Sequence, residues 1–398
     1  MLNRKNLLFL FLCLLIISSC SEDDATPKNV VLVESTRILS RSANELKTFL
    51  NASPVKIDAN ELKYDVDIYK VTYTTSYKGA TINASGLVIL PKTTDKVGML
   101  SFQHGTIVAQ SEAPSTLAIA NTQLILYAAL GSAGFIGVIP DFIGFGESKN
   151  NFHPYYVEEA TATAVIDNLK AAQELAREYD VNFNKKLFLA GYSQGGYATM
   201  AAHKAIETDD LDGFELIASF PASGGYDVKG MQEYLFAQQT YDQPHYIAYV
   251  ALSYQSYYNW TGTLPEFFKE PYATRLPSLF NGTNTTSNIN DQLTIKIPDL
   301  VQTDLIQNIN TTAKYQYLVT AFNENSLLDW TPKTKMYMYH GNADTTVPYQ
   351  NSVETYNHLI NNGASTDVVT FTTLPGADHG SGIFPYVESF MKIALTLK

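Results

Sequence analysis

The stretch Lys186–Ala205, KLFLAGYSQGGYATMAAHKA, decides the fold of this chain. A short apolar run ends at Ala190, small residues surround Ser193, and an alanine-rich pattern with helical spacing follows. A G-x-S-x-G turn between a strand and a helix holds its serine in a strained backbone, so the neighbouring residues must lack bulky side chains. Because such a turn lifts the hydroxyl above the end of a sheet, the motif indicates that Ser193 is a nucleophile.

Short apolar runs recur along the chain and alternate with helical patterns. The apolar runs cover 97–102, 135–139, 187–190, 216–220, 335–339 and 368–372, and the helical patterns lie near 119–132, 158–179, 195–207, 350–361 and 382–396. This order predicts an α/β fold, in which a mostly parallel sheet carries helices on both faces. The alternating residues from Tyr64 to Pro91, with a turn at Lys78-Gly79, predict an antiparallel hairpin at the edge of that sheet.

One interval between predicted strands is far longer than the others. Roughly 115 residues separate 216–220 from 335–339, whereas a crossover between parallel strands needs only a few tens. We therefore expect a largely helical cap at 225–330, between the two parts of a core at 61–224 and 331–398. The cap holds 11 of the 26 tyrosines, namely Tyr226, Tyr234, Tyr241, Tyr246, Tyr249, Tyr254, Tyr257, Tyr258, Tyr272, Tyr315 and Tyr317. Most should pack the cap's own helices, but an aromatic cap over a sheet edge also suits a pocket for an organic ligand.

A serine hydroxyl is a weak nucleophile until an adjacent base takes its proton. Of the seven histidines, His379 follows the last predicted strand, where the chain order nucleophile, acid, histidine places the base. Asp344 follows the preceding strand, in HGNADTTVP, and would orient His379 and stabilise its charged form. Asp378 is a rival, but a residue adjacent to the histidine usually points elsewhere, so we favour Asp344.

Two backbone N–H groups are candidates for stabilising an oxyanion near Ser193. Gln194 opens the predicted helix after the serine, which directs its N–H toward an oxygen that gains negative charge. The second donor should come from the loop after Phe102, where His104-Gly105-Thr106 offers the Thr106 N–H. We expect His104 to support this loop rather than to act as a second base.

The ordered motifs HGT, PDFIGFGES, GYSQGG, HGNADTTVP and GADHG resemble those of the α/β-hydrolases, and specifically of their secretory-lipase and esterase branch. The resemblance covers about residues 60–398, and PDFIGFGES (140–148) carries Phe142 where that branch usually has tyrosine. It implies the α/β-hydrolase fold, the triad Ser193, Asp344 and His379, and an insertion over the site. Many such lipases contain disulfides, whereas this folded domain has no cysteine for one, so the acyl-chain preference of the cap stays open.

The first residues are typical of a secretory signal rather than of the fold. Arg4 and Lys5 precede the apolar run Leu7–Ile17, which is too short for an ordinary membrane span. Residues 17–20, ISSC, resemble a bacterial lipobox, and SEDD behind them resembles the acidic export tag of surface lipoproteins of Bacteroidetes. We therefore predict a signal peptide at 1–19, an acylated Cys20, and a tether with one helix at 20–60. The chain would then be anchored by lipid to the bacterial outer membrane, and the sequence leaves open whether it is exposed at the surface or held on the inner face of that membrane; simple secretion is the alternative.

Composition excludes some functions and leaves others open. A net charge of −12 without a Lys/Arg cluster beyond the first residues argues against nucleic-acid binding. The chain lacks H-E-x-x-H, a cysteine pair in the folded domain and a phosphate loop, so we expect no metal or cofactor. The leading hypothesis is a serine hydrolase of small-molecule, glycan or lipid esters, with activity falling below about pH 6 as His379 is protonated.

Two alternatives remain to that hypothesis. The first is a serine peptidase of the prolyl-oligopeptidase type, which shares this kind of catalytic domain, although the N-terminal region is too short for the propeller that such enzymes usually carry. The second is a surface binding lipoprotein with a decayed hydrolase fold, although decay would normally remove a member of the triad.

Overall fold

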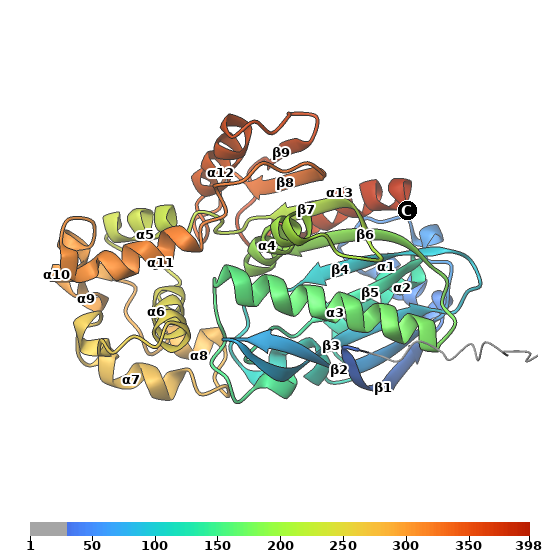
Figure 1. Cartoon of the computed structure of the whole chain (residues 1–398), viewed down its shortest axis with the longest axis horizontal. Coiled ribbons are helices and arrows are strands. Elements are labelled where there is room, and N and C mark those ends of the chain that lie inside the picture. Colours follow the sequence, from blue (N-terminus) through green and yellow to red (C-terminus); the bar gives the residue numbers. More distant parts are fainter. Residues whose placement is uncertain (1–29) are drawn as a thin grey trace, which may run out of the picture.

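The computed structural model describes residues 30–398; the predicted signal peptide and Cys20 lie outside them. Nine strands form one sheet in the order β1-β2-β3-β5-β4-β6-β7-β8-β9 (Figure 1). From β4 and β5 onward all neighbouring strands pair in parallel, as the short apolar runs predicted. The strands are β1 (Leu32–Arg41), β2 (Val66–Tyr77), β3 (Ala80–Pro91), β4 (Val97–Gln103), β5 (Phe135–Pro140), β6 (Phe183–Tyr192), β7 (Glu215–Ala222), β8 (Lys335–Gly341) and β9 (Val369–Leu374).

The predicted hairpin forms as β2 and β3, but it lies one strand in from the edge of the sheet. Strand β1, within the segment expected to be a tether and a helix, covers β2 in antiparallel pairing, and β3 pairs with β5. Most side chains of β1 are exposed or half-buried, so its sequence carries little strand pattern. Its start is held instead by a distant group, because the Glu174 carboxylate accepts hydrogen bonds from the N–H groups of Val31 and Leu32.

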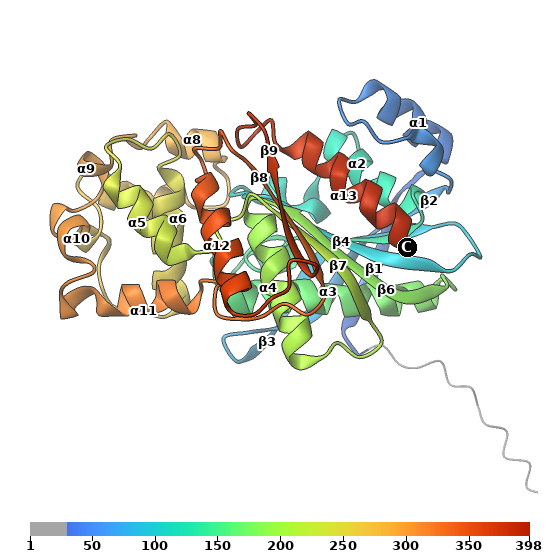
Figure 2. The same ribbon diagram turned by 90° about the horizontal axis from the view of Figure 1, so that it is seen from above.

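Helices cover both faces of the sheet, which confirms the predicted fold class (Figure 2). On one face, α1 (Ala43–Ala52), α2 (Thr122–Ser132) and α13 (Ile383–Leu397) contribute to a common apolar cluster. On the other face lie α3 (Glu158–Glu178), α4 (Gln194–Asp209) and α12 (Tyr349–Asn361). This burial from both sides leaves the loops at the carboxyl ends of the strands free to carry polar groups.

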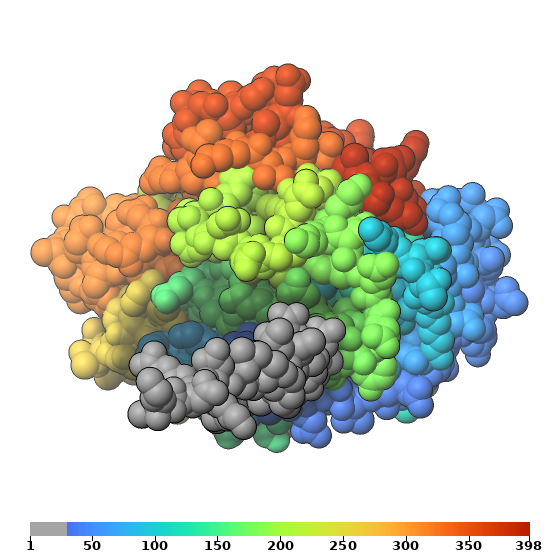
Figure 3. All heavy atoms as spheres, turned by 45° about the vertical axis from the view of Figure 1, so that its right-hand side comes forward, coloured from blue at the N-terminus to red at the C-terminus, as the bar shows by residue number. Residues whose placement is uncertain are grey.

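The long interval between β7 and β8 forms a separate layer of helices, which we call the cap (residues 225–330). It lies beyond the end of α4, and Figure 3 shows it packed directly against the core. Its contacts with the core include hydrogen bonds from the Tyr254 hydroxyl to the Tyr156 carbonyl and from the Tyr197 hydroxyl to the Asn325 carbonyl, both 2.8 Å. The cap helices are α5 (Val228–Ala237), α6 (His245–Tyr257), α7 (Tyr272–Leu279), α8 (Thr286–Asn290), α9 (Ile297–Leu300), α10 (Thr303–Asn308) and α11 (Gln316–Glu324).

Within residues 30–398, no helix combines the length and apolar character that a membrane crossing requires.

Candidate active site

Ser193 lies on a sharp turn between β6 and α4, in the left-handed region of backbone space at φ 61° and ψ −123°. Its N–H donates to the Ala222 carbonyl on β7 at 2.9 Å, which helps to hold the strained turn in place. Glycine is required on both sides of Ser193 because other backbone atoms lie too close for a side chain. A Cβ at Gly195 would collide with the Gln103 carbonyl of β4, and a Cβ at Gly191 would collide with the Gly195 carbonyl. The small residues of the motif therefore let strand, turn and helix meet around one serine.

The structure brings together the three side chains predicted for the triad. The His379 Nε2 atom lies 2.9 Å from the Ser193 hydroxyl oxygen, and the His379 Nδ1 atom lies 2.6 Å from Asp344 Oδ2. Ser193 comes from the turn after β6, Asp344 from the loop after β8, and His379 from the loop between β9 and α13. With Nδ1–H donating to the carboxylate, Nε2 is free to accept the proton of the serine hydroxyl.

The Asp344 carboxylate is buried and held by several donors. Its Oδ1 atom accepts from the N–H groups of Thr346 and Val347, both at 2.9 Å, and its Oδ2 atom accepts from His340 Nε2 at 3.2 Å as well as from His379. Burial by itself would raise the pKa of Asp344, but hydrogen bonds and charge from His340 and His379 outweigh it and lower the pKa to about 2. The carboxylate is thus ionised at neutral pH and can stabilise a charged His379.

The rival carboxylate, Asp378, is engaged elsewhere. Its Oδ1 atom accepts from the Gly380 N–H at 3.0 Å, and from the N–H and hydroxyl of Ser381 at 2.8 and 2.7 Å. These bonds lower the pKa of Asp378 and tie it to its own turn. Asp344, not Asp378, therefore contacts the imidazole of His379.

Both predicted oxyanion loops lie beside the nucleophile. Gln194 is the first residue of α4, so its N–H has no acceptor within the helix and lies at the helix's partially positive end. The loop after β4 passes close to Ser193, because a Cβ at Gly105 would lie 3.7 Å from the Ser193 Cβ. Among residues 30–398, no acceptor is found for the N–H of Thr106. Two backbone donors are thus available at the rim, by which we mean the edge of the sheet where the loops after β4, β6, β8 and β9 meet.

Two buried histidines that received no role from the sequence support these groups. His153 Nδ1 lies 2.7 Å from the Ile143 carbonyl, and Nε2 lies 2.7 Å from the side-chain nitrogen of Gln194. Burial lowers the pKa of His153 to about 3, so the ring is neutral and Nε2 accepts from Gln194. His340, the first residue of HGNADTTVP, bonds to Ser352 through Nδ1 at 2.6 Å and to Asp344 through Nε2. Their only signal in the sequence was proximity to the motifs.

His104 and Asp141 organise the loops rather than the proton transfer. The His104 Nδ1 atom donates to the Gly105 carbonyl at 2.7 Å, and burial lowers the pKa of His104. Asp141, in PDFIGFGES, is fully buried and accepts from the hydroxyls of Ser85 and Ser115, both at 2.5 Å. Its burial raises its pKa despite these bonds. The motif thereby links β3 and β5 to the loop that carries Ser115.

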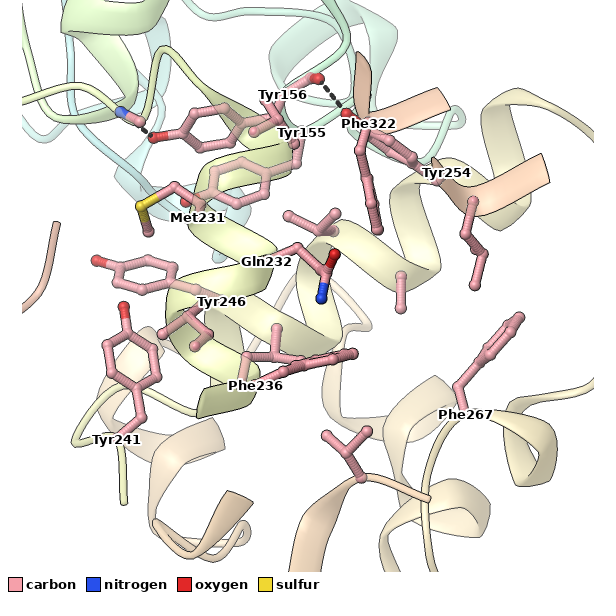
Figure 4. A pocket seen from close by; sticks show the side chains of 18 of the residues that line it. Tyr155, Tyr156, Met231, Gln232, Phe236, Tyr241, Tyr246, Tyr254, Phe267 and Phe322 are labelled. Atoms are coloured by element: carbon pink, nitrogen blue, oxygen red, sulfur yellow. Dashed lines mark hydrogen bonds between the residues drawn. The ribbon is translucent and has the colours of Figure 1, made fainter. Parts of the chain in front are cut away.

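Ser193 opens into a cavity of about 120 Å³ that is lined mainly by apolar and aromatic side chains of the cap (Figure 4). Three of the cap tyrosines, Tyr241, Tyr246 and Tyr254, line it together with Tyr155 and Tyr156 of the core. Three of these hydroxyls bind other protein atoms: that of Tyr155 binds the Thr106 hydroxyl at 2.9 Å, and those of Tyr241 and Tyr254 donate to the carbonyls of Thr346 and Tyr156, both at 2.8 Å. The tyrosines therefore present mostly ring carbon to the cavity, and none of its lining residues is charged.

Residues 30–398 contain no group of three or more His, Cys, Asp and Glu side chains placed to hold a metal ion.

Comparisons with known proteins agree with this architecture. Residues 109–210 match the family model described as secretory lipase. The structure is similar to that of a hydrolase candidate from Legionella pneumophila, at 26% identity over 92% of this chain and 97% of the other, with a TM-score of 0.82. It is also similar to the rice cell wall degrading esterase LipA from Xanthomonas oryzae, at 24% identity over 92% and 98% of the two chains, with a TM-score of 0.79.

A more distant similarity is to Candida antarctica lipase A in its closed state, at 15% identity over 92% of this chain and 82% of the other, with a TM-score of 0.64. No curated protein sequence matches the chain. Together, the matches show the α/β-hydrolase fold and fit its secretory-lipase and carboxylesterase branch.

Proposed function

We propose that this α/β-hydrolase is a serine carboxylic-ester hydrolase. The observation that carries the proposal is the continuous hydrogen-bonded row from Asp344 through His379 to Ser193, at 2.6 and 2.9 Å. A nucleophile within reach of a base, and a base oriented by a buried carboxylate, is the arrangement that activates a hydroxyl for acyl transfer. The family match and the esterase and lipase folds it resembles support the same chemistry.

In the first half of the reaction, the Ser193 oxygen attacks the ester carbonyl carbon while His379 Nε2 takes the hydroxyl proton. The carbonyl oxygen becomes an oxyanion, which the N–H groups of Gln194 and Thr106 stabilise. His379 then gives its proton to the departing alcohol as the carbon–oxygen bond breaks. The ionised Asp344 stabilises the imidazolium between these two transfers.

In the second half, water replaces the alcohol and cleaves the acyl-enzyme. His379 takes one proton from the water as its oxygen attacks the acyl carbon, and the same two N–H groups hold the second oxyanion. The Ser193 oxygen leaves and recovers a proton from His379. The free acid is released, and the site returns to its starting state without any cofactor.

The cavity beyond Ser193 supports an ester whose acyl part is largely apolar. Its lining residues carry no charge, so they offer nothing to bind the ionised amino terminus of a peptide. This favours an ester hydrolase over a peptidase of the prolyl-oligopeptidase type. The intact contacts of all three triad members likewise argue against a decayed binding protein.

The test compares wild type with Ser193→Ala on p-nitrophenyl butyrate and octanoate. We expect kcat to fall by about 10⁵–10⁶-fold, because a triad without its nucleophile retains little of its catalysis. Ser278→Ala, an exposed serine on α7, is the matched control and should keep full activity. A fluorophosphonate probe should label wild type and the control but not Ser193→Ala. Hydrolysis by Ser193→Ala at the wild-type rate would reject the proposal, and a wild type that neither reacts with the probe nor cleaves esters would favour the binding protein.

We also propose that Cys20, which lies outside the described residues, carries a lipid anchor in the bacterial outer membrane. The support is the signal-like start and the lipobox-like ISSC, since two or more acyl chains make anchoring stable. Palmitate labelling and detergent-phase partition of the full-length protein should be lost in Cys20→Ala and kept in Cys13→Ala. Equal labelling of the two variants would contradict the anchor, and protease treatment of whole cells would test surface exposure.

A further inference from the structure

Helix α5 presents one polar residue on a face that is otherwise apolar. Val228, Met231, Gln232, Leu235 and Phe236 all line the cavity, at the spacing of a single helix face. The charged residues of this helix lie off that face, where Lys229 and Glu233 pair with each other. Four of the five cavity-facing positions hold the apolar side chains that the pattern predicts, and Gln232 is the exception.

The amide of Gln232 has no partner in the protein. The residue is only 8% exposed, and its Oε1 atom is fully buried without a hydrogen bond. Within residues 30–398, its side-chain nitrogen makes no hydrogen bond either. Exchanging the oxygen and nitrogen positions would leave the group just as unpaired. Buried amides are nearly always bonded, because losing water without gaining a partner is unfavourable.

The surroundings explain why the protein does not pair this amide itself. Figure 4 shows the Gln232 side chain extending into the cavity between Phe322 and Phe236. Two tyrosine hydroxyls of the same cavity lining donate to other groups: that of Tyr254 donates to the Tyr156 carbonyl at 2.8 Å, and that of Tyr241 donates to the Thr346 carbonyl. A partner for Gln232 must therefore come from whatever occupies the cavity.

We propose that the cavity selects acyl chains that carry a hydroxyl group, and that Gln232 binds that hydroxyl. This inference rests on the proposed function, because Ser193 lines the same cavity and would hold the acyl chain at its carbonyl end. A hydroxyl is the best match, because it can donate or accept and can therefore pair with whichever end of the amide faces the cavity. A carboxylate or an ammonium group fits poorly, because no charged residue lines the cavity. The substrate class is thus esters of hydroxylated aliphatic acids.

The experiment measures acid release from methyl octanoate and from the methyl esters of 2-, 3-, 6-, 7- and 8-hydroxyoctanoate. In wild type, we expect kcat/KM for one hydroxy isomer to exceed that for octanoate by about tenfold, because a site built to pair a substrate hydroxyl discriminates against the analogue that lacks it. In Gln232→Leu, the order should reverse, with octanoate becoming the better substrate. Gln239→Leu, an exposed glutamine just beyond α5, is the matched control and should keep the wild-type preference.

A second measurement separates this inference from the proposed catalysis. Calorimetry with Ser193→Ala should show tighter binding of the preferred hydroxyoctanoate methyl ester than of methyl octanoate, and Gln232→Leu added to that variant should abolish the difference. The inference is overturned if wild type cleaves methyl octanoate but favours no hydroxy isomer, and if Ser193→Ala binds the hydroxylated and plain methyl esters with equal constants. The amide would then be paired by water alone. If wild type cleaves no ester, the proposed function fails, and the binding measurement still decides whether Gln232 recognises a hydroxyl.

Discussion

The rim of the sheet and the interior of the cap treat polar groups in opposite ways. At the rim, Asp344 alone accepts four hydrogen bonds, and each of the histidines around it is oriented by a partner. In the cap, tyrosine hydroxyls that line the cavity are bonded to protein atoms, and the amide of Gln232 is left without a partner. The difference separates two tasks: the triad is organised for proton transfer before any ligand arrives, whereas the amide of Gln232 in the cap is left for the ligand to bind.

The largest effect on kcat should come from replacing Asp344, the carboxylate of the triad. We expect Asp344→Asn to lower kcat by about 10⁴-fold, because the amide cannot hold His379 in the required tautomer or stabilise its charge. Asp378→Asn is the matched control at the neighbouring loop and should lower kcat by far less, since Asp378 bonds only to its own turn. Steady-state kinetics on p-nitrophenyl butyrate decides between them; equal losses in the two variants would contradict the assignment.

The pH dependence of the activity tests the role of Asp344 in a second way. Because the pKa of Asp344 is lowered to about 2, its carboxylate stays ionised throughout the mildly acidic range. Protonation of Asp344 therefore cannot account for a loss of activity above about pH 4. We expect kcat/KM to fall by about tenfold per pH unit on the acid side of the profile, because the base that accepts the serine proton must be unprotonated. A profile that stays flat to pH 4 would show that no histidine acts as the base.

His340 tests how strongly the rim depends on residues that never touch a substrate. It donates from Nε2 to Asp344, so His340→Leu should lower kcat by about 10–100-fold, the value of a hydrogen bond to a charged group. The pKa of Asp344 should rise toward its ordinary value, and His340→Gln should restore part of the rate. His358→Leu, on the exposed side of α12, is the control. A loss of thermal stability without a loss of kcat would make His340 purely structural.

The smallest effect should come from the far end of the cap. Leu305 of α10 lines the cavity, and α10 lies far from α4 in both ribbon views (Figures 1 and 2). We expect the larger side chain of Leu305→Trp to fill the far end of the cavity. The ratio of kcat/KM for p-nitrophenyl decanoate to that for the butyrate should fall by about tenfold, which is the effect of excluding one or two methylene groups. A chain-length series of p-nitrophenyl esters measures this ratio. A uniform loss at every length would mean that the substitution disturbs the rim instead.

Local sequence was sufficient for much of the core. The apolar runs and helical patterns gave the parallel strands and the helices that cover them, and Gly191 to Gly195 marked the turn at Ser193. Chain order was enough to choose Asp344 and His379, because the carboxyl ends of parallel strands meet at one edge. Strand β1 was not foreseen, since its exposed side chains show little alternation and its start is bonded to Glu174, more than a hundred residues away.

The amino-acid pattern alone was enough to identify the nucleophile turn, because that turn demands particular small residues within five positions. Only the tertiary structure shows which buried histidines support this turn. His153 contacts Gln194, 41 positions further along the chain, and His340 has a role because it contacts the Asp344 carboxylate. The lone amide of Gln232 is likewise ordinary in the sequence. Its meaning arises only when helices from distant parts of the cap enclose it, because burial turns a polar group that water would satisfy into one that needs a ligand.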